Sequence, residues 1–144
     1  MSEDVKERRL AGLRLFRGAD AKAIRHLASA ADEVSVGAGH VLIRQGHNHQ
    51  ELYIIESGGA VVEVDDEQVA EIPAGELIGE LGYFVRTTAS ATVTTSADST
   101  VMVIPYNRFA QILGENPGLV LTIATELAER LHAMDVRLQH DHMQ

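Results

Sequence analysis

The middle of the chain consists of short runs rich in Val and Ile, each followed by turn residues. Between residues 34 and 106 these runs are VSVGAGHVLIRQG, ELYIIESGG, AVVEVDD, QVAEIPAG and SATVTTSADSTVMVIPY, the last of which holds two strands. Valine, isoleucine and threonine favour strands, and strands at such short spacing are typical of closed or stacked sheets. The pattern therefore predicts a β-barrel or sandwich of roughly eight strands rather than βαβ units.

Two turns inside this region are predicted from their residues. Asp65-Asp66 is expected at the tip of a hairpin, and Ala97-Asp98-Ser99 is expected to separate the last two strands. Because side chains alternate along a strand, Val62 and Val64 are expected to share one face of theirs.

Helical periodicity precedes the β region. Residues 3–16 are predicted to form a short amphipathic helix. A second helix is predicted over residues 21–31, with Asp20 as its N-cap. The apolar face of the first helix would carry Val5, Leu10, Leu13 and Phe16.

Helical periodicity also returns after Pro105. Asn107 is expected to cap a helix that ends at Gly114. Asn116-Pro117 is expected to open a final helix over residues 118–140, because a proline is tolerated in the first helical turn.

The final helix carries an apolar seam with the spacing of a coiled coil. A helix of this length extends about 30 Å, at 1.5 Å per residue, so the barrel can cover only its first turns. The seam therefore predicts a homodimer through this helix, and the alternative is packing on the chain's own barrel. Its residues are Val120, Ile123, Leu127, Leu131, Met134 and Leu138.

The length of 144 residues suits one domain with one core, and 45 % of the residues are apolar. We expect a mainly β fold with flanking helices: a helical part over 1–32, a β-barrel over 33–105 and C-terminal helices over 106–140. The barrel would be of the jelly-roll kind found in cupins.

Composition narrows the classes of function. The absence of Cys excludes disulfides, Cys-ligated zinc and iron–sulfur clusters, and fits a reducing, cytoplasmic location. No apolar run reaches about 18 residues, so no membrane span is expected, and the charged N-terminus is unlike a secretory signal. The net charge of −9 argues against a nucleic-acid partner.

The basic residues are unevenly distributed. Seven of the 12 lie within the first 25 residues, and none lies between Arg44 and Arg86. The stretch from Glu51 to Glu80 carries nine acidic residues. A phosphate bound by this region would therefore have to use backbone N–H groups, a helix N-terminus or a distant arginine.

The segment GELIGELGYF, residues 75–84, is the most informative for function. Its three glycines permit positive φ angles and close approach of a ligand. A short helical turn beginning near Gly79 would direct free N–H groups toward an anion. Glu80 would place a carboxylate beside that site, which suits a ribose hydroxyl.

With these motifs in place, the chain resembles the cyclic nucleotide-binding domain family. The likeness is strongest to the effector domain of bacterial catabolite-activator-type (Crp/Fnr) regulators, without their DNA-binding domain, and runs from about Leu15 to about Met134. The matching motifs are GHVLIRQG at 39–46, LYII at 52–55, Ser57-Gly58, Pro73-Ala74-Gly75, IGEL at 78–81, SATV at 90–93, Asn116-Pro117 and LAERL at 127–131.

The resemblance implies roles for individual residues. Glu80 would bind the ribose 2′-hydroxyl, and Leu81 belongs to the same motif. The backbone of Gly79, Ser90 and Ala91 would line the cyclic phosphate. An apolar pocket would be shaped by Val62, Val64, Leu77 and Val93. The base-contact positions of the final helix would be Met134 and Asp135.

Two positions depart from the family's pattern. The family normally has an arginine directly before the Ser-Ala-Thr-Val element, where this chain has Ala89. A charge-assisted contact to phosphate contributes about 1.5–3 kcal/mol, so its loss would weaken binding tenfold to a hundredfold. Arg86, three residues earlier, could substitute only if its loop were re-routed. The usual polar base-contact pair is replaced by Met134-Asp135.

We therefore expect a regulatory module, not an enzyme, that binds a cyclic nucleotide of the cAMP or cGMP type and signals through its final helix to an unknown effector protein. The alternative is a degenerate domain that has lost its ligand and acts as a dimeric interaction adaptor. No cofactor and no DNA partner are expected.

A metal-dependent, cupin-like enzyme is a remote third possibility. His47 and His49, followed by Glu51, have metal-ligand spacing on a strand. The cupin pattern would require a further histidine at position 78, which is Ile78. A polar turn is therefore the preferred interpretation of this segment.

Overall fold

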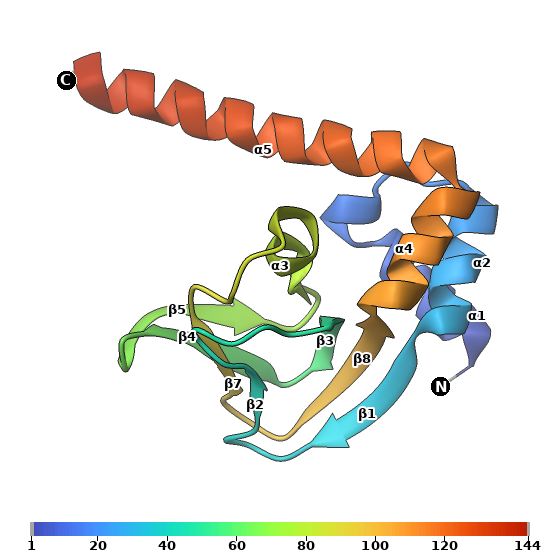
Figure 1. Ribbon diagram of the computed structural model, residues 1–144, viewed down its shortest axis with the longest axis horizontal. Coiled ribbons are helices and arrows are strands. Elements are labelled where there is room, and N and C mark those ends of the chain that lie inside the picture. Colours follow the sequence, from blue (N-terminus) through green and yellow to red (C-terminus); the bar gives the residue numbers. More distant parts are fainter. Residues whose placement is uncertain (1, 144) are drawn as a thin grey trace.

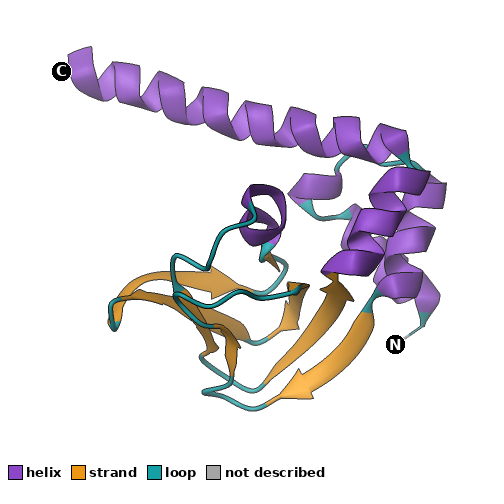
Figure 2. Cartoon of the chain, viewed as in Figure 1, coloured by secondary structure: helices purple, strands orange, loops and turns teal. Residues whose placement is uncertain are grey.

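The computed structural model describes the backbone of residues 2–143 and the side chains of residues 2–137. Helices enclose one end of a β-roll, and the long C-terminal helix extends past it (Figure 1, Figure 2). The helical elements are α1 (Glu3–Ala11), the 3-10 helix η1 (Arg14–Phe16), α2 (Ala21–Ala30), α3 (Glu80–Val85), α4 (Tyr106–Glu115) and α5 (Pro117–Met143). The strands are β1 (Asp32–Val36), β2 (Val41–Ile43), β3 (Glu51–Ser57), β4 (Gly59–Val64), β5 (Glu67–Pro73), β6 (Leu77–Ile78), β7 (Thr92–Thr95) and β8 (Ser99–Pro105).

Within the described residues the strands form two four-stranded antiparallel sheets. One has the order β1-β8-β3-β6 and the other β2-β7-β4-β5. This arrangement confirms the predicted mainly β class. The predicted turn near Ala97 does separate β7 from β8, but the two strands lie in different sheets, so the turn carries the chain from one sheet to the other.

The hairpin predicted at Asp65-Asp66 is confirmed. Both residues have positive φ, at 52° and 66°, which aspartate tolerates better than most side chains. The register then shifts, because Val62 pairs with Ala70 whereas Glu63 pairs with Gln68. Val69 is therefore the extra residue of a bulge in β5.

Two apolar clusters hold these layers together. One joins the helices to the outer face of β3 and β8, and includes Ile54 and Phe109. The other fills the roll between the sheets, with Ile55 at 0 % exposure. Consecutive residues of β3 thus serve opposite faces, as a strand's alternation requires. The second cluster forms the apolar floor on which the candidate site is built.

The N-terminal helix is shorter than predicted. The expected helix over 3–16 breaks at Gly12, which ends α1, and a separate 3-10 turn follows. Glycine disfavours the helix interior because it loses the most backbone entropy. The Asp20 N-cap is confirmed, since Oδ1 of Asp20 accepts the Ala23 N–H at 2.8 Å.

The predicted ends of α4 are both wrong. The helix begins at Tyr106 with Pro105 at the N-cap, and the Asn107 side chain accepts from the Arg108 N–H instead. Gly114 lies inside the helix, which ends one residue later. Asn116 supplies the stop, because its Nδ2 donates to the Ile112 carbonyl, and α5 opens at Pro117 as predicted.

The first turns of α5 pack against η1 and α4, and the helix then runs out above α3 and the roll (Figure 1). Residues 131–137, all of them exposed, are the free part of α5. Ile123 is 2 % exposed, and Leu127 is half-buried against the helical cluster. Val120, Leu131 and Met134 are 47 %, 67 % and 56 % exposed, and the Leu138 side chain lies outside the described residues. The seam is thus divided between core and surface, and the homodimer stays a prediction.

None of the helices described between residues 2 and 143 combines the length and the apolar composition needed to cross a membrane.

Candidate functional site

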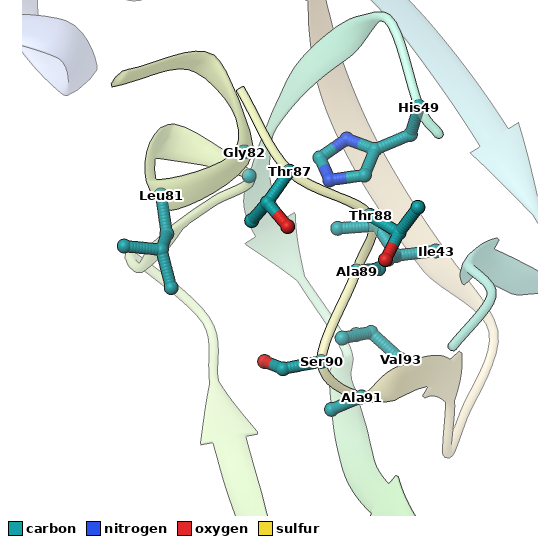
Figure 3. A pocket seen from close by; sticks show the side chains of 11 residues that line it. Ile43, His49, Leu81, Gly82, Thr87, Thr88, Ala89, Ser90, Ala91 and Val93 are labelled. Carbon is teal, nitrogen blue, oxygen red and sulfur yellow. The ribbon is translucent and has the colours of Figure 1, made fainter. Parts of the chain in front are cut away.

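A cavity of about 140 Å³ opens between α3 and the segment that leads into β7. Figure 3 shows side chains from four parts of the chain around it. Its floor is apolar, from the cluster inside the roll, and the segment 87–90 adds three hydroxyls to its wall. The lining residues are Ile43, His49, Gly79, Leu81, Gly82, Thr87, Thr88, Ala89, Ser90, Ala91 and Val93.

The first wall depends on the glycine at position 79. Gly79 has φ of +100°, and a Cβ at this position would lie 2.9 Å from the Glu51 carbonyl oxygen. Only glycine fits such a backbone at such close approach. The chain turns here out of β6, and α3 begins at Glu80, which confirms the short helix predicted near Gly79.

The opposite wall, residues 87–91, is fixed by backbone pairing to the loop after β2. The Gly46 N–H donates to the Ala89 carbonyl at 2.8 Å, and the Ala89 N–H donates to the His47 carbonyl at 3.0 Å. The Ala89 side chain packs against the cluster inside the roll. The position where the resemblance implied an arginine therefore presents a methyl group to the cavity.

His49, expected to lie in a polar turn, lines this cavity. The His49 ring extends from its loop toward Gly82 and Thr87 (Figure 3). Its Nδ1 is 3.0 Å from the hydroxyl of Tyr106, 57 residues away, and that hydroxyl donates to the Gly79 carbonyl at 2.5 Å. No local pattern carries this signal, because the partner belongs to the junction of β8 and α4.

Glu80, expected to meet a ribose, has its side chain outside the cavity. It lines a separate hollow of about 240 Å³, and its Oε1 is 3.9 Å from Nη1 of Arg130 on α5. Burial raises the pKa of the Glu80 carboxyl, and Glu76 adds to the rise. The backbone N–H of Glu80 and the charge of Arg130 both lower this pKa. Leu77 lines the same hollow.

Arg86 does not reach the cavity either. It has φ of +61° at the end of α3, and its guanidinium lies 4.7 Å from the centre of the Tyr83 ring. Stacking on an aromatic face is a common position for arginine and leaves the segment 87–91 without a cation. Among the described residues that line the cavity there is no Lys or Arg.

The remaining residues of the expected pocket are dispersed. Val62 packs into the cluster inside the roll, and Val64 belongs to the same strand but does not line the cavity. Met134 and Asp135 are exposed on the free part of α5. The cavity thus unites Gly79, Leu81, Ala89, Ser90, Ala91 and Val93 of the expected site.

The histidines of the loop after β2 do not form a metal centre. Among the described residues, no group of three or more His, Asp or Glu side chains is arranged to hold a metal ion.

Known proteins share this architecture. The cyclic nucleotide-binding domain family matches residues 33–116. The cAMP-activated global transcriptional regulator CRP of Salmonella typhimurium is 33% identical over 96 residues, which cover 62% of this chain and 46% of that protein. Lysophospholipase nte1 of Aspergillus fumigatus is 29% identical over 111 residues, which cover 74% of this chain and 7% of that protein.

A solved structure extends the likeness to three dimensions. The regulatory domain of Toxoplasma gondii PKA with cAMP is 28% identical, with a TM-score of 0.71, over 76% of this chain and 44% of that one. The chain spans less than half the length of each of these relatives.

The matched range contains every residue that lines the cavity, including both walls and the floor. On the family match and on the shared fold, this chain belongs to the cyclic nucleotide-binding domain family.

Proposed function

We propose that this domain is a regulatory sensor: a small anionic ligand occupies the cavity, and α5 transmits its presence to a protein partner. The proposed role is regulatory and not catalytic. The observation that carries it is the contact between Glu80 of α3 and Arg130 of α5, because α3 also forms one wall of the cavity. A ligand that moves α3 would therefore act directly on α5.

The proposed ligand is a cyclic nucleotide of the cAMP or cGMP type. Glu80 would exchange Arg130 for the ribose hydroxyl, and the freed Arg130 would release α5. Family membership supports this ligand class, and so do the hydroxyl-bearing residues Thr87, Thr88 and Ser90 that line the cavity.

Calorimetry with cAMP and cGMP tests the proposal. We expect heat of binding for the unaltered chain, and weaker binding for Glu80→Ala. Ala89→Arg is expected to raise the affinity about tenfold to a hundredfold, because it supplies a cation where the wall now has a methyl group. If neither cAMP nor cGMP gives heat of binding at high micromolar concentration, the proposed ligand is overturned.

Two observations favour a second function. No arginine or lysine lines the cavity among its described residues, and the Glu80 side chain is directed to α5. A domain that keeps the fold but has lost its ligand, and works as an interaction adaptor, fits both facts. Tight nucleotide binding that is lost in Glu80→Ala would exclude it.

We also propose a homodimer through the free part of α5. Leu131 and Met134 are exposed apolar side chains of one seam, so they need a partner. Light scattering is expected to give a dimer for the unaltered chain and a monomer for Leu131→Asp. His132→Asp places the same carboxylate beside the seam and is expected to leave the dimer intact. A monomeric unaltered chain would contradict the proposal.

A further inference from the structure

His49 is the one titratable side chain among the described residues that line the cavity. The chain on either side of His49 is fixed in place. The loop that carries it pairs through Gly46 and His47 with Ala89, and β3 begins two residues later at Glu51. The ring is therefore part of a fixed wall, directed between Gly82 and Thr87 (Figure 3).

The hydrogen bonds of Tyr106 determine where the proton of a neutral His49 lies. The phenol has a single proton, and it donates that proton to the Gly79 carbonyl at 2.5 Å. The contact between Nδ1 of His49 and the same hydroxyl, at 3.0 Å, then requires Nδ1 to be the donor. The neutral ring therefore carries its proton on Nδ1 and leaves a lone pair on Nε2.

Nε2 is the atom that faces Gly82 beside the cavity. A Cβ built on Gly82 would lie 2.7 Å from Nε2, so only glycine leaves room for the ring in this position. When the ring gains a second proton, Nδ1 keeps its bond to Tyr106 and Nε2 becomes a charged donor. That donor replaces the cation that the segment 87–91 lacks.

We infer that His49, protonated on Nε2, binds an anionic phosphate oxygen of the ligand in this cavity. The inference rests on the proposed function, because it takes the cavity as the ligand site. Thr87, Thr88 and Ser90 line the same cavity and can add neutral hydroxyl donors to the phosphate. Where the free ring is neutral, binding takes up a proton from solvent and forms the Nε2–H bond, and no other covalent bond changes.

The ionisation state of Tyr106 supports this protonation of His49 on Nε2. Burial, then Glu80 and Tyr53, raise the pKa of Tyr106 to about 12 against an opposing effect of Arg86, so the phenol keeps its proton at neutral pH. The titratable and charged groups on the elements around His49 include Tyr106, Tyr83, Glu80, Arg86, Tyr53, Glu51, Glu56 and His47.

The proton position can be measured without any ligand. Nitrogen-15 spectra of the full chain, with His49→Gln used to assign the signal, report which ring nitrogen carries the proton in neutral His49. We expect the Nδ1–H tautomer. The Nε2–H tautomer would overturn the inference, because that form already has a donor at the cavity and cannot take up a proton there.

Binding to phosphate provides the second measurement. Calorimetry with cAMP in two buffers of different ionisation enthalpy is expected to show proton uptake by the unaltered chain. His49→Gln should abolish the uptake and lower the affinity about tenfold to a hundredfold. His47→Gln, in the same loop but outside the cavity lining, should change neither.

The outcomes separate the inference from the proposed function. If cAMP binds equally well to His49→Gln, with no proton uptake in either protein, the inference is overturned and the sensor proposal stands. If neither nucleotide binds but inorganic phosphate shifts the His49 ring signals and not those of His47, the nucleotide proposal fails and the inference stands. If no phosphate compound shifts the His49 signals, the inference is overturned.

Discussion

Arg130, in the middle of α5, places its Nη1 3.9 Å from Oε1 of Glu80, the first residue of α3. This ion pair joins the helix that lines the cavity to the helix that leaves the domain. The Nε of Arg130 also lies 3.5 Å from Oε1 of Glu126, one turn earlier in α5. The pair therefore links the candidate site to α5 through a single charged contact.

The Glu80–Arg130 pair is expected to contribute little to stability. The two side chains are 25 % and 41 % exposed, and exposed pairs contribute roughly 0.2–1 kcal/mol. A double-mutant cycle with Glu80→Gln and Arg130→Met, followed by urea denaturation, should give a coupling in that range that declines with added salt. Arg137→Met, further along α5, should show no coupling to Glu80→Gln. A coupling well above 1 kcal/mol would contradict this view of the pair as a weak, breakable link.

The aromatic cluster beneath α3 should dominate the stability of the site. Phe109 is 0 % exposed, and its ring centre is 4.9 Å from that of Tyr83 in α3. Phe109→Ala is expected to lower the free energy of unfolding by about 3–5 kcal/mol, because it removes buried surface and leaves a cavity. Phe84→Ala, at a position 40 % exposed, is the matched control and should cost clearly less. Equal costs would show that the cluster is not the support of α3.

Two glycines are expected to respond in opposite directions to alanine. Gly58 has φ of +90°, and an added Cβ would lie 2.1 Å from Oγ of Ser99 and 2.7 Å from the Asp98 carbonyl oxygen, so Gly58→Ala should destabilise the chain. Gly114 lies inside α4 with no atom near its would-be Cβ. Gly114→Ala should stabilise by about 0.4–1 kcal/mol. Thermal denaturation compares the two, and a stable Gly58→Ala protein would be inconsistent with the backbone described between β3 and β4.

Glu56 should make the stability depend on pH. Burial, then the Glu33 carboxyl, raise the pKa of Glu56 above its ordinary value, against the effect of Arg9. Neither of its carboxyl oxygens has a hydrogen-bond partner in the described part of the chain. A raised pKa in the folded state means that this group's stabilising contribution is present below the ordinary pKa of glutamate. The contribution is lost as the pH rises through the folded-state pKa.

Glu56→Gln should therefore be more stable than the unaltered chain at neutral pH, and the difference should shrink as the pH falls. Urea denaturation from mildly acidic to neutral pH measures this difference. Glu71→Gln, at an exposed position of β5, is the control for the loss of one negative charge. If the difference in the free energy of unfolding stayed constant across this pH range, the raised pKa of Glu56 would be contradicted.

Much of the fold follows from local patterns. The Val- and Ile-rich runs, the Asp65-Asp66 hairpin and the opening of α5 at Pro117 were predictable, because alternation, positive φ and the missing proline N–H act within a few residues. The ends of α4 were not predictable in this way. Asn107 and Gly114 are good terminal residues, yet β8 sets the start of the helix, and Asn116 supplies the stop.

The candidate site was predictable as a segment and not as a set of side-chain contacts. The glycines of residues 75–84 and the Ser-Ala element after Ala89 identified both walls, because backbone geometry and motif spacing are local properties. The direction of Glu80 toward Arg130, and the stacking of Arg86 on Tyr83, depend on where α5 and the core place their side chains.

The sequence by itself thus determined the β-roll with its helices, the family likeness and the absence of a cation at Ala89. Only the tertiary structure brought His49 to the cavity, because its ring is oriented by Tyr106 at a distance of 57 residues along the chain. Strand pairing and apolar periodicity are encoded in neighbouring residues. The hydrogen bond between His49, just before β3, and Tyr106, just after β8, exists only once β3 and β8 lie side by side in one sheet.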